Sequence, residues 1–456
     1  MAGGKIAAKV GRAACPHAAE GGVLATKNTK ATKAMKPSGV AWLGDIPDGW
    51  ELRRGKYLLS QISEPSSSQN KVALENIESG TGKYIDSNAI LQGNGIAFTQ
   101  GDILYGKLRP YLAKVWLAEF EGNAVGDFFV YRVATAYYNC YAKYVMLAPS
   151  FTAITNDSTY GAKMPRVSAE FIANLRFPLP PLPEQRAIAD YLDKKCGAID
   201  AAIAEAKKGI EEYKAWKISL IDDVVCNGIV RHKCRKETGE VWLTDIPDEW
   251  EFTQIRYLFA LRDERNDKPL KDVNLISLYT DKGVVQHADL EKTTGNKAST
   301  ADGYKLVYEN DIVANIILCW MGAVGRSAYN GVTSPAYDVY RPINPTKVLS
   351  RYYHYLFRTP RFNGNCYEEG RGIMMMRWRT YSSEFRAIKV PVPPIEEQQA
   401  IANYLDEKCA AIDAMVTEKE ALISDLESYK KSLIYEVVTG KKEPEAAASG
   451  TGQEVA

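Results

Sequence analysis

The sequence lacks the features that mark several classes of protein. Its 456 residues contain four histidines and eight cysteines, and none of these cysteines forms a CxxC pair, so a structural zinc site is not expected. No run of about 18 apolar residues occurs, so no membrane span is expected. Lys and Arg number 57 against 56 Asp and Glu, a net charge of +1. The chain as a whole therefore does not attract nucleic acid, and any such contact requires local patches.

Motifs of catalysis are also missing. ESGTGKY has Ile77 where a phosphate-binding loop requires its first glycine, and neither HExxH nor GxSxG occurs. The methyltransferase signature of Asn or Asp followed by Pro-Pro-aromatic is absent, and Asn344-Pro345-Thr346 is the nearest string. An Asp/Glu/Lys nuclease set stays open, although nothing points to one. We expect a non-catalytic cytoplasmic protein with reduced thiols and no bound metal or cofactor.

What the sequence contains is an internal duplication. PPLPEQRAIADYLDKKCGAID begins at Pro180, and PPIEEQQAIANYLDEKCAAID begins at Pro393. Earlier segments match in the same order, such as WLGDIPDGW from Trp42 with WLTDIPDEW from Trp242, and VYR at Val130 with VYR at Val339. Two copies of about 200 residues are too long for a solenoid repeat, so each copy is a domain with a connector.

Both copies follow one pattern, a β-rich and aromatic-rich module, a short helical stretch, and a long helix after Pro-Pro. The fold class is therefore α+β, with two tandem β-rich α/β modules separated by two long antiparallel coiled-coil helices in a pseudo-two-fold arrangement. Residues 1–37 are expected to be a disordered leader, with a cleaved transit peptide as the alternative. The other predicted boundaries are 38–180 for the first module, 181–228 for the first helix, 229–390 for a linker and the second module, 391–440 for the second helix, and 441–456 for a flexible tail.

The long helices carry a seam of residues with alternating spacings of four and three, which is typical of a coiled coil. The seam positions are Leu192, Cys196, Ile199, Ile203, Ala206, Ile210, Tyr213, Lys217, Leu220 and Val224 in the first helix, and Leu405, Cys409, Ile412, Val416, Lys419, Ile423, Leu426, Lys430, Leu433 and Val437 in the second. A helix of about 65 Å cannot bury such a stripe on one module, so the partner is its twin. A two-fold-like pairing requires the helices to be antiparallel. The alternative, in which the helices only attach two domains to each other, does not explain their equal lengths.

The copies differ in the loops of their modules, and these loops carry local charge. Between Arg351 and Val390 there are eight Lys or Arg and three Asp or Glu, and RGIMMMRWR interleaves arginines with Met and Trp. Such side chains can bind phosphates and base edges, although a solvated surface is the competing interpretation. The candidate DNA-binding residues are Lys107, Arg109, Tyr111, Lys114, Tyr160, Lys163, Arg166, Asn315, Trp320, Arg326, Tyr337, Arg371, Arg377, Trp378 and Arg379. Lys163 and Arg377 occupy equivalent places, and both are expected to touch DNA.

With its two helix starts and two variable modules, the chain resembles the specificity subunit of type I restriction-modification systems over residues 38–442. The motifs that carry the resemblance are SGVAWLGDIPDGW, GDILYGKLRPYL, SPAYDVYRP and the duplicated PPxxEQ helix start. The resemblance implies two target recognition domains that each bind half of a bipartite site on double-stranded DNA. It also implies two methyltransferase subunits and two restriction subunits as partners, with S-adenosylmethionine, ATP and Mg²⁺ bound by those partners.

Two other functions remain open from the sequence. A protein-binding adaptor with two β-rich modules on a helical spacer is the first, and the matched basic and aromatic loops argue against it. A self-sufficient nuclease or methylase is the second, and it requires catalytic residues that no motif reveals. The sequence does not identify the DNA site.

Overall fold

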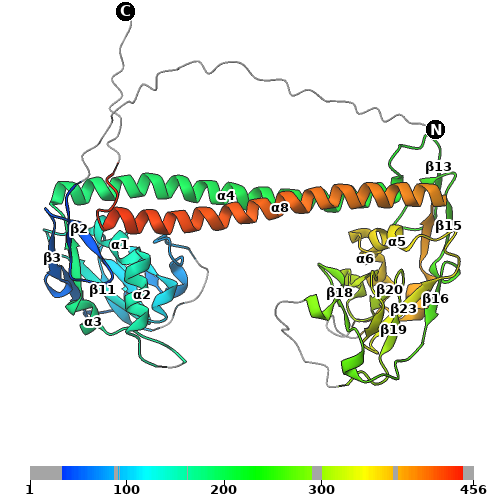
Figure 1. The fold of residues 1–456 in the computed structure, drawn as a ribbon, viewed down its shortest axis with the longest axis horizontal. Helices are drawn as coiled ribbons and strands as arrows, with labels where there is room; N and C mark the ends of the chain where they lie inside the picture. The colour runs from blue at the N-terminus through cyan, green and yellow to red at the C-terminus, as the bar shows by residue number, and fades with distance from the viewer. Residues whose placement is uncertain are drawn as a thin grey trace, which may run out of the picture. The chain divides into compact units, whose positions relative to one another are not determined.

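The computed structural model of the chain describes residues 33–86, 91, 93–161, 163–289, 300–372 and 378–444. They fall into two compact units, Met1–Lys195 with Lys431–Ala456, and Cys196–Lys430. Each unit contains one module (Figure 1). The two long helices, α4 (Leu182–Asn227) and α8 (Ile395–Val438), both contribute residues to each unit.

The first module begins and ends on the same antiparallel ribbon, in which β3 (Glu51–Arg54) pairs with β12 (Arg176–Leu179). Its central antiparallel sheet has the order β4-β11-β8-β9, and a second sheet has the order β5-β7-β10-β6. The remaining elements are β1 (Met35–Pro37), β2 (Asp45–Pro47), η1 (Gly55–Tyr57), β4 (Leu59–Ile62), β5 (Pro65–Ser66), β6 (Lys71–Val72), η2 (Leu74–Asn76), β7 (Gly95–Phe98), β8 (Ile103–Gly106), η3 (Pro110–Leu112), β9 (Val115–Leu117), β10 (Gly122–Ala124), β11 (Phe128–Val133), α1 (Asn139–Leu147), α2 (Pro149–Asp157) and α3 (Ala169–Asn174).

The second module repeats the ribbon and the central sheet of this plan, but its other strands form two-stranded sheets. β15 (Glu251–Gln254) pairs with β24 (Lys389–Val392), and the central sheet has the order β16-β23-β20-β21. The remaining elements are β13 (Arg235–Glu237), β14 (Asp245–Pro247), η4 (Ile255–Tyr257), β16 (Phe259–Arg262), η5 (Leu270–Asp272), β17 (Ile276–Tyr279), β18 (Gly283–Gln286), η6 (His287–Asp289), β19 (Lys305–Val307), β20 (Ile312–Asn315), η7 (Cys319–Met321), β21 (Val324–Arg326), β22 (Gly331–Thr333), β23 (Tyr337–Pro342), α5 (Ser350–Leu356), α6 (Pro360–Glu368) and α7 (Ser382–Ala387). The shared order of elements confirms the fold class that the duplication predicts.

The predicted leader is wrong over its last residues. Met35–Pro37 forms β1 and pairs antiparallel with β2, with Met35 opposite Pro47. Lys33 also forms an ion pair with Glu184 in the first turn of α4. These backbone and charge contacts give the segment partners that composition alone does not reveal. Residues 1–32 and 445–456 lie outside the described residues, whereas 441–444 are described, and the backbone N–H of Lys442 donates to the Glu436 carbonyl (3.1 Å).

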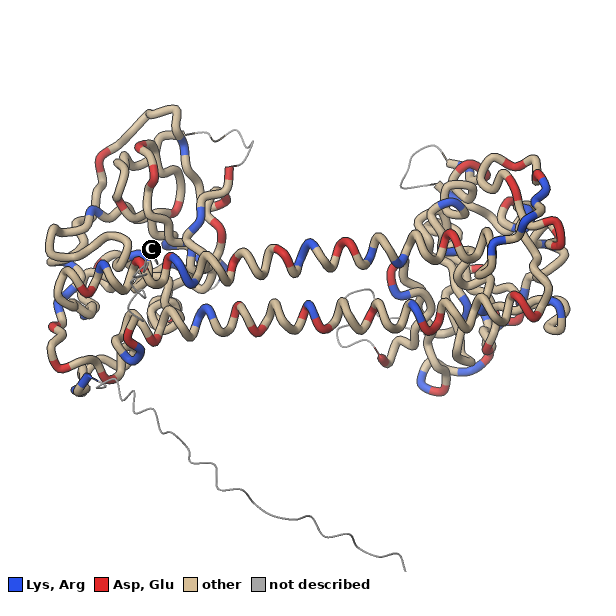
Figure 2. The backbone as a smooth tube through the Cα atoms, turned by 90° about the horizontal axis from the view of Figure 1, so that it is seen from above, with Lys and Arg blue, Asp and Glu red and all other residues tan. Residues whose placement is uncertain are grey.

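The predicted seam is confirmed by burial. Each of its positions on α4 and α8 is buried or half-buried, and Leu192 and Leu405 are completely buried. Acidic and basic residues are interspersed along both helices (Figure 2), and most of them are exposed. Mixed charge keeps the exposed faces solvated without creating a stripe of one sign. No helix of the described residues is long and apolar enough to cross a membrane.

Two equivalent ion pairs show that the helices are antiparallel. Within the unit Cys196–Lys430, the ammonium of Lys217 lies 2.7 Å from the carboxylate of Asp413, and that of Lys430 lies 2.6 Å from Asp200. Lys217 and Lys430 are equivalent seam positions of the two copies, and Asp200 and Asp413 are equivalent residues next to the seam. The paired segments 196–227 and 395–430 therefore run in opposite directions with local two-fold symmetry, as the sequence predicts. Charged residues in a seam favour one register over others.

The end of each helix packs on the module of the other copy. The hydroxyl of Tyr141 on α1 donates to the carbonyl of Val438 at the end of α8 (2.9 Å). The hydroxyl of Tyr352 on α5 donates to the carbonyl of Val225 near the end of α4 (2.8 Å). After α8 the backbone turns at Gly440 (φ 73°), where a Cβ would lie 2.4 Å from the Pro47 ring. Both the turn and the close approach require glycine at this stop.

A buried glutamine joins each module to the start of its own helix. The side-chain amide of Gln185 donates to the carbonyls of Pro180 and Ala136 (2.8 and 3.1 Å) and accepts from the N–H of Tyr138 (2.7 Å). The second copy repeats all three contacts through Gln398, which reaches Pro393, Lys347 and Leu349 at 2.8, 2.9 and 2.9 Å. We call this arrangement the glutamine lock. It satisfies backbone groups at the point where the chain passes from module to helix.

The glutamine lock predicts that substitution by leucine destabilises the protein at Gln398 but not at the adjacent Gln399. Gln398→Leu leaves two carbonyls and one N–H of the protein interior without partners, which should lower the free energy of unfolding by about 2–4 kcal/mol. Gln399 is the matched control, because its side chain bonds Asn403 on the exposed face of α8. Gln399→Leu should change stability by no more than about 0.5 kcal/mol. Urea denaturation of the full chain compares the two variants, and equal losses would contradict the lock.

Candidate nucleic-acid interface

The first module brings its two predicted loops together. The loop after β8 and the loop before α3 form a β-bridge between Leu108 and Arg166. The backbone N–H of Arg109 donates to the carbonyl of Pro165 (2.8 Å), and that of Val167 donates to the carbonyl of Lys107 (3.1 Å). The two segments that carry the predicted residues therefore adjoin each other, and we call their described residues, 107–114, 160–161 and 163–166, the first loop pair.

Part of the positive charge of the first loop pair is already balanced. The guanidinium of Arg166 binds the carboxylate of Asp127 through Nε and Nη2 (3.1 and 2.9 Å). The ammonium of Lys107 lies 3.8 Å from the same carboxylate and 5.5 Å from the centre of the Phe129 ring. These contacts fix the direction of both side chains. The sequence analysis did not include Asp127, and no motif around it indicates this role.

The outer residues of the first loop pair are open to solvent. The side chains of Arg109 and Lys163 are exposed, and neither has an ion-pair or hydrogen-bond partner among the described residues. Tyr111 and Tyr160 are 52% and 61% exposed. Arg109 has a left-handed backbone (φ 51°), a conformation that non-glycine residues adopt at a cost. Exposed cations beside exposed aromatic rings suit phosphates, sugars and bases.

Lys114 points into the module instead. Its ammonium donates to the carbonyls of Leu74 (2.6 Å) and Ile77 (2.9 Å). Burial lowers the pKa of this lysine. The contacts hold η2 against the sheet, so the structure assigns Lys114 to the fold of the module.

The second module also joins its two loops. The N–H of Thr380 donates to the carbonyl of Ile316 (2.9 Å), which links the loop after β20 to the loop before α7. Tyr367 on α6 stacks on Trp378 (ring centres 4.9 Å apart) and contacts Trp320 (5.5 Å). Both predicted tryptophans therefore contact a tyrosine that is not among the residues predicted from the sequence. We call the described residues of these segments, 315–322, 371–372 and 378–380, the second loop pair.

The remaining predicted residues of the second module differ in exposure. Arg371 and Arg379 form a β-bridge through their backbones, and the Arg371 side chain is 77% exposed although it pairs with Glu384 (3.1 Å). Arg379 is also exposed. Arg377 lies outside the described residues, so its contact with DNA stays a prediction.

Three other predicted residues lie on strands of the central sheet. The side-chain oxygen of Asn315 accepts from the N–H of Ile317 (3.0 Å), and its strand neighbour Tyr337 is half-buried. Arg326 donates to the side chain of Asn310 (2.7 Å). Asn315 is buried, whereas the contact of Arg326 lies at the surface, because Asn310 is exposed.

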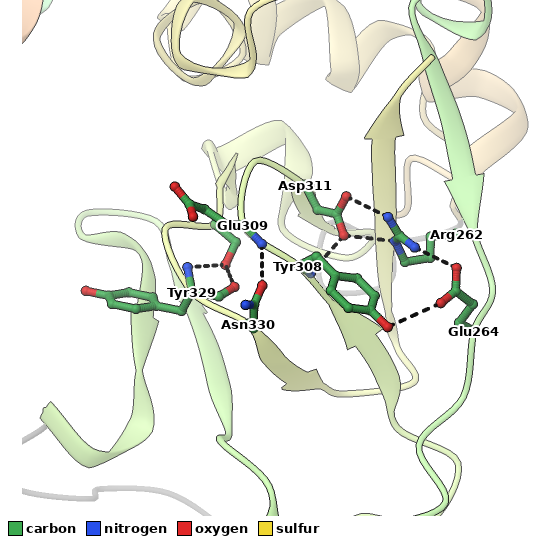
Figure 3. A network of polar contacts seen from close by, with 8 residues as sticks. Arg262, Glu264, Tyr308, Glu309, Asp311, Tyr329 and Asn330 are labelled. Carbon is green, nitrogen blue, oxygen red and sulfur yellow. Dashed lines mark hydrogen bonds and ion pairs between the residues drawn. The ribbon is translucent and has the colours of Figure 1, made fainter. Parts of the chain in front are cut away.

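A buried aspartate holds the turn that leads into the central sheet of each module. Asp102 accepts from the N–H of Thr99 (2.8 Å), and the equivalent Asp311 accepts from the N–H of Tyr308 (2.9 Å). The neutralising arginines come from strands that are not equivalent. Arg132 on β11 binds Asp102, whereas Arg262 on β16 binds Asp311 (Figure 3).

The pKa values of the two carboxyl groups are shifted in opposite directions. Burial raises the pKa of Asp102, but the bonds from Arg132 and Thr99 outweigh burial and hold the pKa below its usual value. For Asp311 burial outweighs the bonds from Tyr308 and Arg262, and the pKa is raised. The same turn is thus held under different electrostatic conditions in the two modules. No cluster of His, Cys, Asp and Glu among the described residues could hold a metal ion.

His354 supports the strand that carries Arg326. Its Nδ1 accepts from the N–H of Arg326 (3.1 Å), which requires a neutral ring. Burial, together with the charges of Arg358 and Arg326, lowers the pKa of His354 to about 3. Arg358 itself donates to the carbonyls of Val324 (3.3 Å) and Asp281 (2.9 Å), so it ties β21 to the turn between β17 and β18.

The family model for the type I restriction modification DNA specificity domain matches residues 54–211 and 247–423. Each match covers most of a module and part of the helix that follows it. Among curated proteins, the chain is 30% identical over 216 residues to the type I restriction enzyme EcoDI specificity subunit of Escherichia coli, a match that covers 45% of this chain and 46% of the relative. The chain thus spans about half the length of that subunit.

Two relatives from Methanocaldococcus jannaschii match over longer stretches. The chain is 23% identical to the MjaVIII specificity subunit over 62% of its own length and 66% of the relative. It is 24% identical to the putative MjaX specificity subunit over 88% of its own length and 95% of the relative.

Solved structures share the fold at low identity. A chain from work on complex assembly and conformational transition of the type I R-M system has a TM-score of 0.66 at 15% identity, over 87% of this chain and 99% of that chain. The HsdS subunit from Thermoanaerobacter tengcongensis has a TM-score of 0.51 at 16% identity, over 87% and 98%. At this identity the likeness concerns the fold alone.

Because Arg109 and Lys114 have different surroundings, we expect substitution of Arg109 to affect DNA binding and substitution of Lys114 to affect the stability of the fold. Arg109→Gln should weaken binding to duplex DNA by about 1–3 kcal/mol and leave unfolding unchanged, since the guanidinium has no partner within the described residues. Lys114→Met should lower stability by about 1–3 kcal/mol, because the carbonyls of Leu74 and Ile77 lose their donor. Fluorescence anisotropy and urea denaturation measure the two quantities. Reversed effects would place Arg109 in the fold and Lys114 on the interface.

The neutral His354 predicts a pH-dependent contribution to stability. The ring is neutral in the folded protein down to about pH 3 but protonates near pH 6.5 when unfolded. Its contribution is therefore complete above pH 6.5 and is lost as the pH falls toward 3, by at most about 1.4 kcal/mol per pH unit. His354→Gln removes this titration. The stability gap between the wild type and the variant should narrow between pH 7 and 5, and a constant gap would disprove the assignment.

Proposed function

The chain belongs to the family of type I restriction-modification DNA specificity domains, and from this premise we propose that it is a specificity subunit that binds a bipartite DNA sequence, one half through each module. The observation that carries the proposal is the contrast between what the modules share and where they differ. The glutamine lock, the helix-end contacts and the buried aspartate recur in both copies. The loop pairs, which have equivalent positions, contain different residues.

In the proposed mechanism the loop pairs contact DNA through two kinds of groups. Cations such as Arg109, Lys163 and Arg379 are exposed and can bind phosphates or the edges of guanine. Exposed tyrosines at positions 111 and 160 add apolar contact with sugars and bases. Residues with internal partners, such as Arg166 on Asp127, position the loops. Two modules with different loops suit an asymmetric site.

The proposal assigns the chemistry to partner subunits. The chain would recruit two adenine methyltransferase subunits, which bind S-adenosylmethionine, and two restriction subunits, which use ATP and Mg²⁺. The near-zero net charge fits this division, since DNA would be enclosed by the assembled complex rather than attracted by this chain alone.

Exchange of one module tests the proposal. Residues 38–180 are replaced with the corresponding module of another specificity subunit, and the methylated adenines of a host genome are sequenced. We expect one half of the methylated bipartite motif to change while the other half stays the same, because each loop pair belongs to one module. Exchange of residues 239–390 is the matched control and should change the other half.

Two results would refute this assignment. If both halves changed after a single exchange, the modules would not act separately. If removal of the whole chain left the pattern of methylated adenines unchanged, the chain would not specify methylation at all.

A further inference from the structure

The ribbon that closes the first module carries two arginines directly opposite each other. Arg54 on β3 and Arg176 on β12 are cross-strand partners, and both side chains are exposed. Neither has an acidic partner among the described residues. Like charges that face each other across a strand pair destabilise the sheet. An anion that binds both would remove this repulsion.

The adjoining turn extends the positive surface. Lys56 and Tyr57 follow in η1, where the ammonium lies 5.0 Å from the centre of the ring and Tyr57 is 62% exposed. Gly55 permits this arrangement, because a Cβ at that position would lie 2.4 Å from the carbonyl of Ile172 on α3. We call Arg54, Lys56, Tyr57 and Arg176 the ribbon patch.

The ribbon patch is not a requirement of the fold. The second module builds the same ribbon with Gln254 opposite Lys389, and Lys389 is paired with Glu240 (2.9 Å). Arg256 and Tyr257 repeat the turn, and Tyr257 is 65% exposed. The fold therefore accepts an uncharged residue at the position of Arg54. Two facing guanidinium groups without acidic partners are a property of the first module.

One short helix of the chain separates the ribbon patch from the first loop pair. The helix α3 connects them, since Arg166 precedes its start at Ala169 and Arg176 follows its end at Asn174 (Figure 1). Six residues of helix span about 9 Å. The backbone N–H of Gly55 donates to the carbonyl of Leu175 (2.8 Å), which holds η1 at that end of the helix. A duplex carries one phosphate charge per about 1.7 Å of its axis, so DNA at the loops also presents phosphates near the patch.

We propose that Arg54 and Arg176 together bind a backbone phosphate of DNA outside the half-site that the first loop pair contacts. This inference rests on the proposed function. A phosphate offers several oxygens to two guanidinium forks, and Lys56 adds a point charge for a neighbouring phosphate. DNA is favoured over an acidic protein surface because only one short helix separates the patch from the candidate interface along the chain. The contact contributes affinity without sequence information.

The test uses the chain assembled with its methyltransferase subunits and fluorescence anisotropy over a range of salt concentrations. The double variant Arg54→Gln/Arg176→Gln copies the uncharged residue of the second module. It should weaken binding of specific and random duplexes alike, by about tenfold, and reduce the slope of log K against log salt by about 1. The methylated sequence should not change. Arg53→Gln is the matched control, because Arg53 is adjacent on β3 and already pairs with Glu51 (3.3 Å).

Each other outcome has a definite meaning. An unchanged salt slope in the double variant, with sequence-specific binding by the wild type, would overturn the inference and leave the proposed function intact. Failure of the variant to assemble with the methyltransferase subunits would overturn it in favour of a protein partner. A changed methylated sequence would overturn it in favour of a base contact. If the wild-type complex did not prefer any duplex sequence, the proposed function itself would fail.

Discussion

The direction in which each long helix leaves its own module depends on a buried side-chain amide at the start of that helix. Gln185 and Gln398 are completely buried, and each makes three hydrogen bonds to the backbone. Two of the satisfied groups belong to the segment before the short helices, and one belongs to the Pro-Pro segment. A buried amide with all partners present is directional, so it fixes how the long helix leaves the module. Apolar packing alone would leave that direction less defined.

The duplication then allows each helix to serve two modules. Each helix begins at its own glutamine lock, and its last turn accepts a tyrosine hydroxyl from the other copy, Tyr352 for α4 and Tyr141 for α8. Antiparallel pairing is what permits both contacts in one chain. Because these buried contacts depend on a small set of residues, the loops on the modules can change without disturbing them. In the proposed function, stability and recognition thus depend on different residues.

The sequence predicts the helices well and the loop surfaces poorly, for a physical reason. The spacing of four and three reports burial directly, so α4 and α8 and their seam follow from it. The presence of a charged residue in the sequence does not show which way its side chain points. Lys114 turns inward to two carbonyls, Arg166 is held by Asp127, and Trp378 stacks on Tyr367. These partners are distant in sequence, so no local pattern identifies them. The pairing of β1 with β2 was missed for the same reason.

The buried aspartates show how duplicated modules diverge under one constraint. Asp102 and Asp311 must both accept the N–H of the residue three positions earlier, and a buried carboxylate requires a cation. The cation comes from β11 in one copy and from β16 in the other. In the first module β11 pairs with β4, and in the second β16 pairs with β23, so in each copy the arginine lies on one strand of the same equivalent pair. A cation on either strand reaches the same carboxylate, so its position can change while the turn stays fixed. Both modules therefore keep the contact between an arginine and the buried aspartate, although the arginine comes from a different position in each. Comparison of the copies by sequence identity alone underestimates how much structure they share.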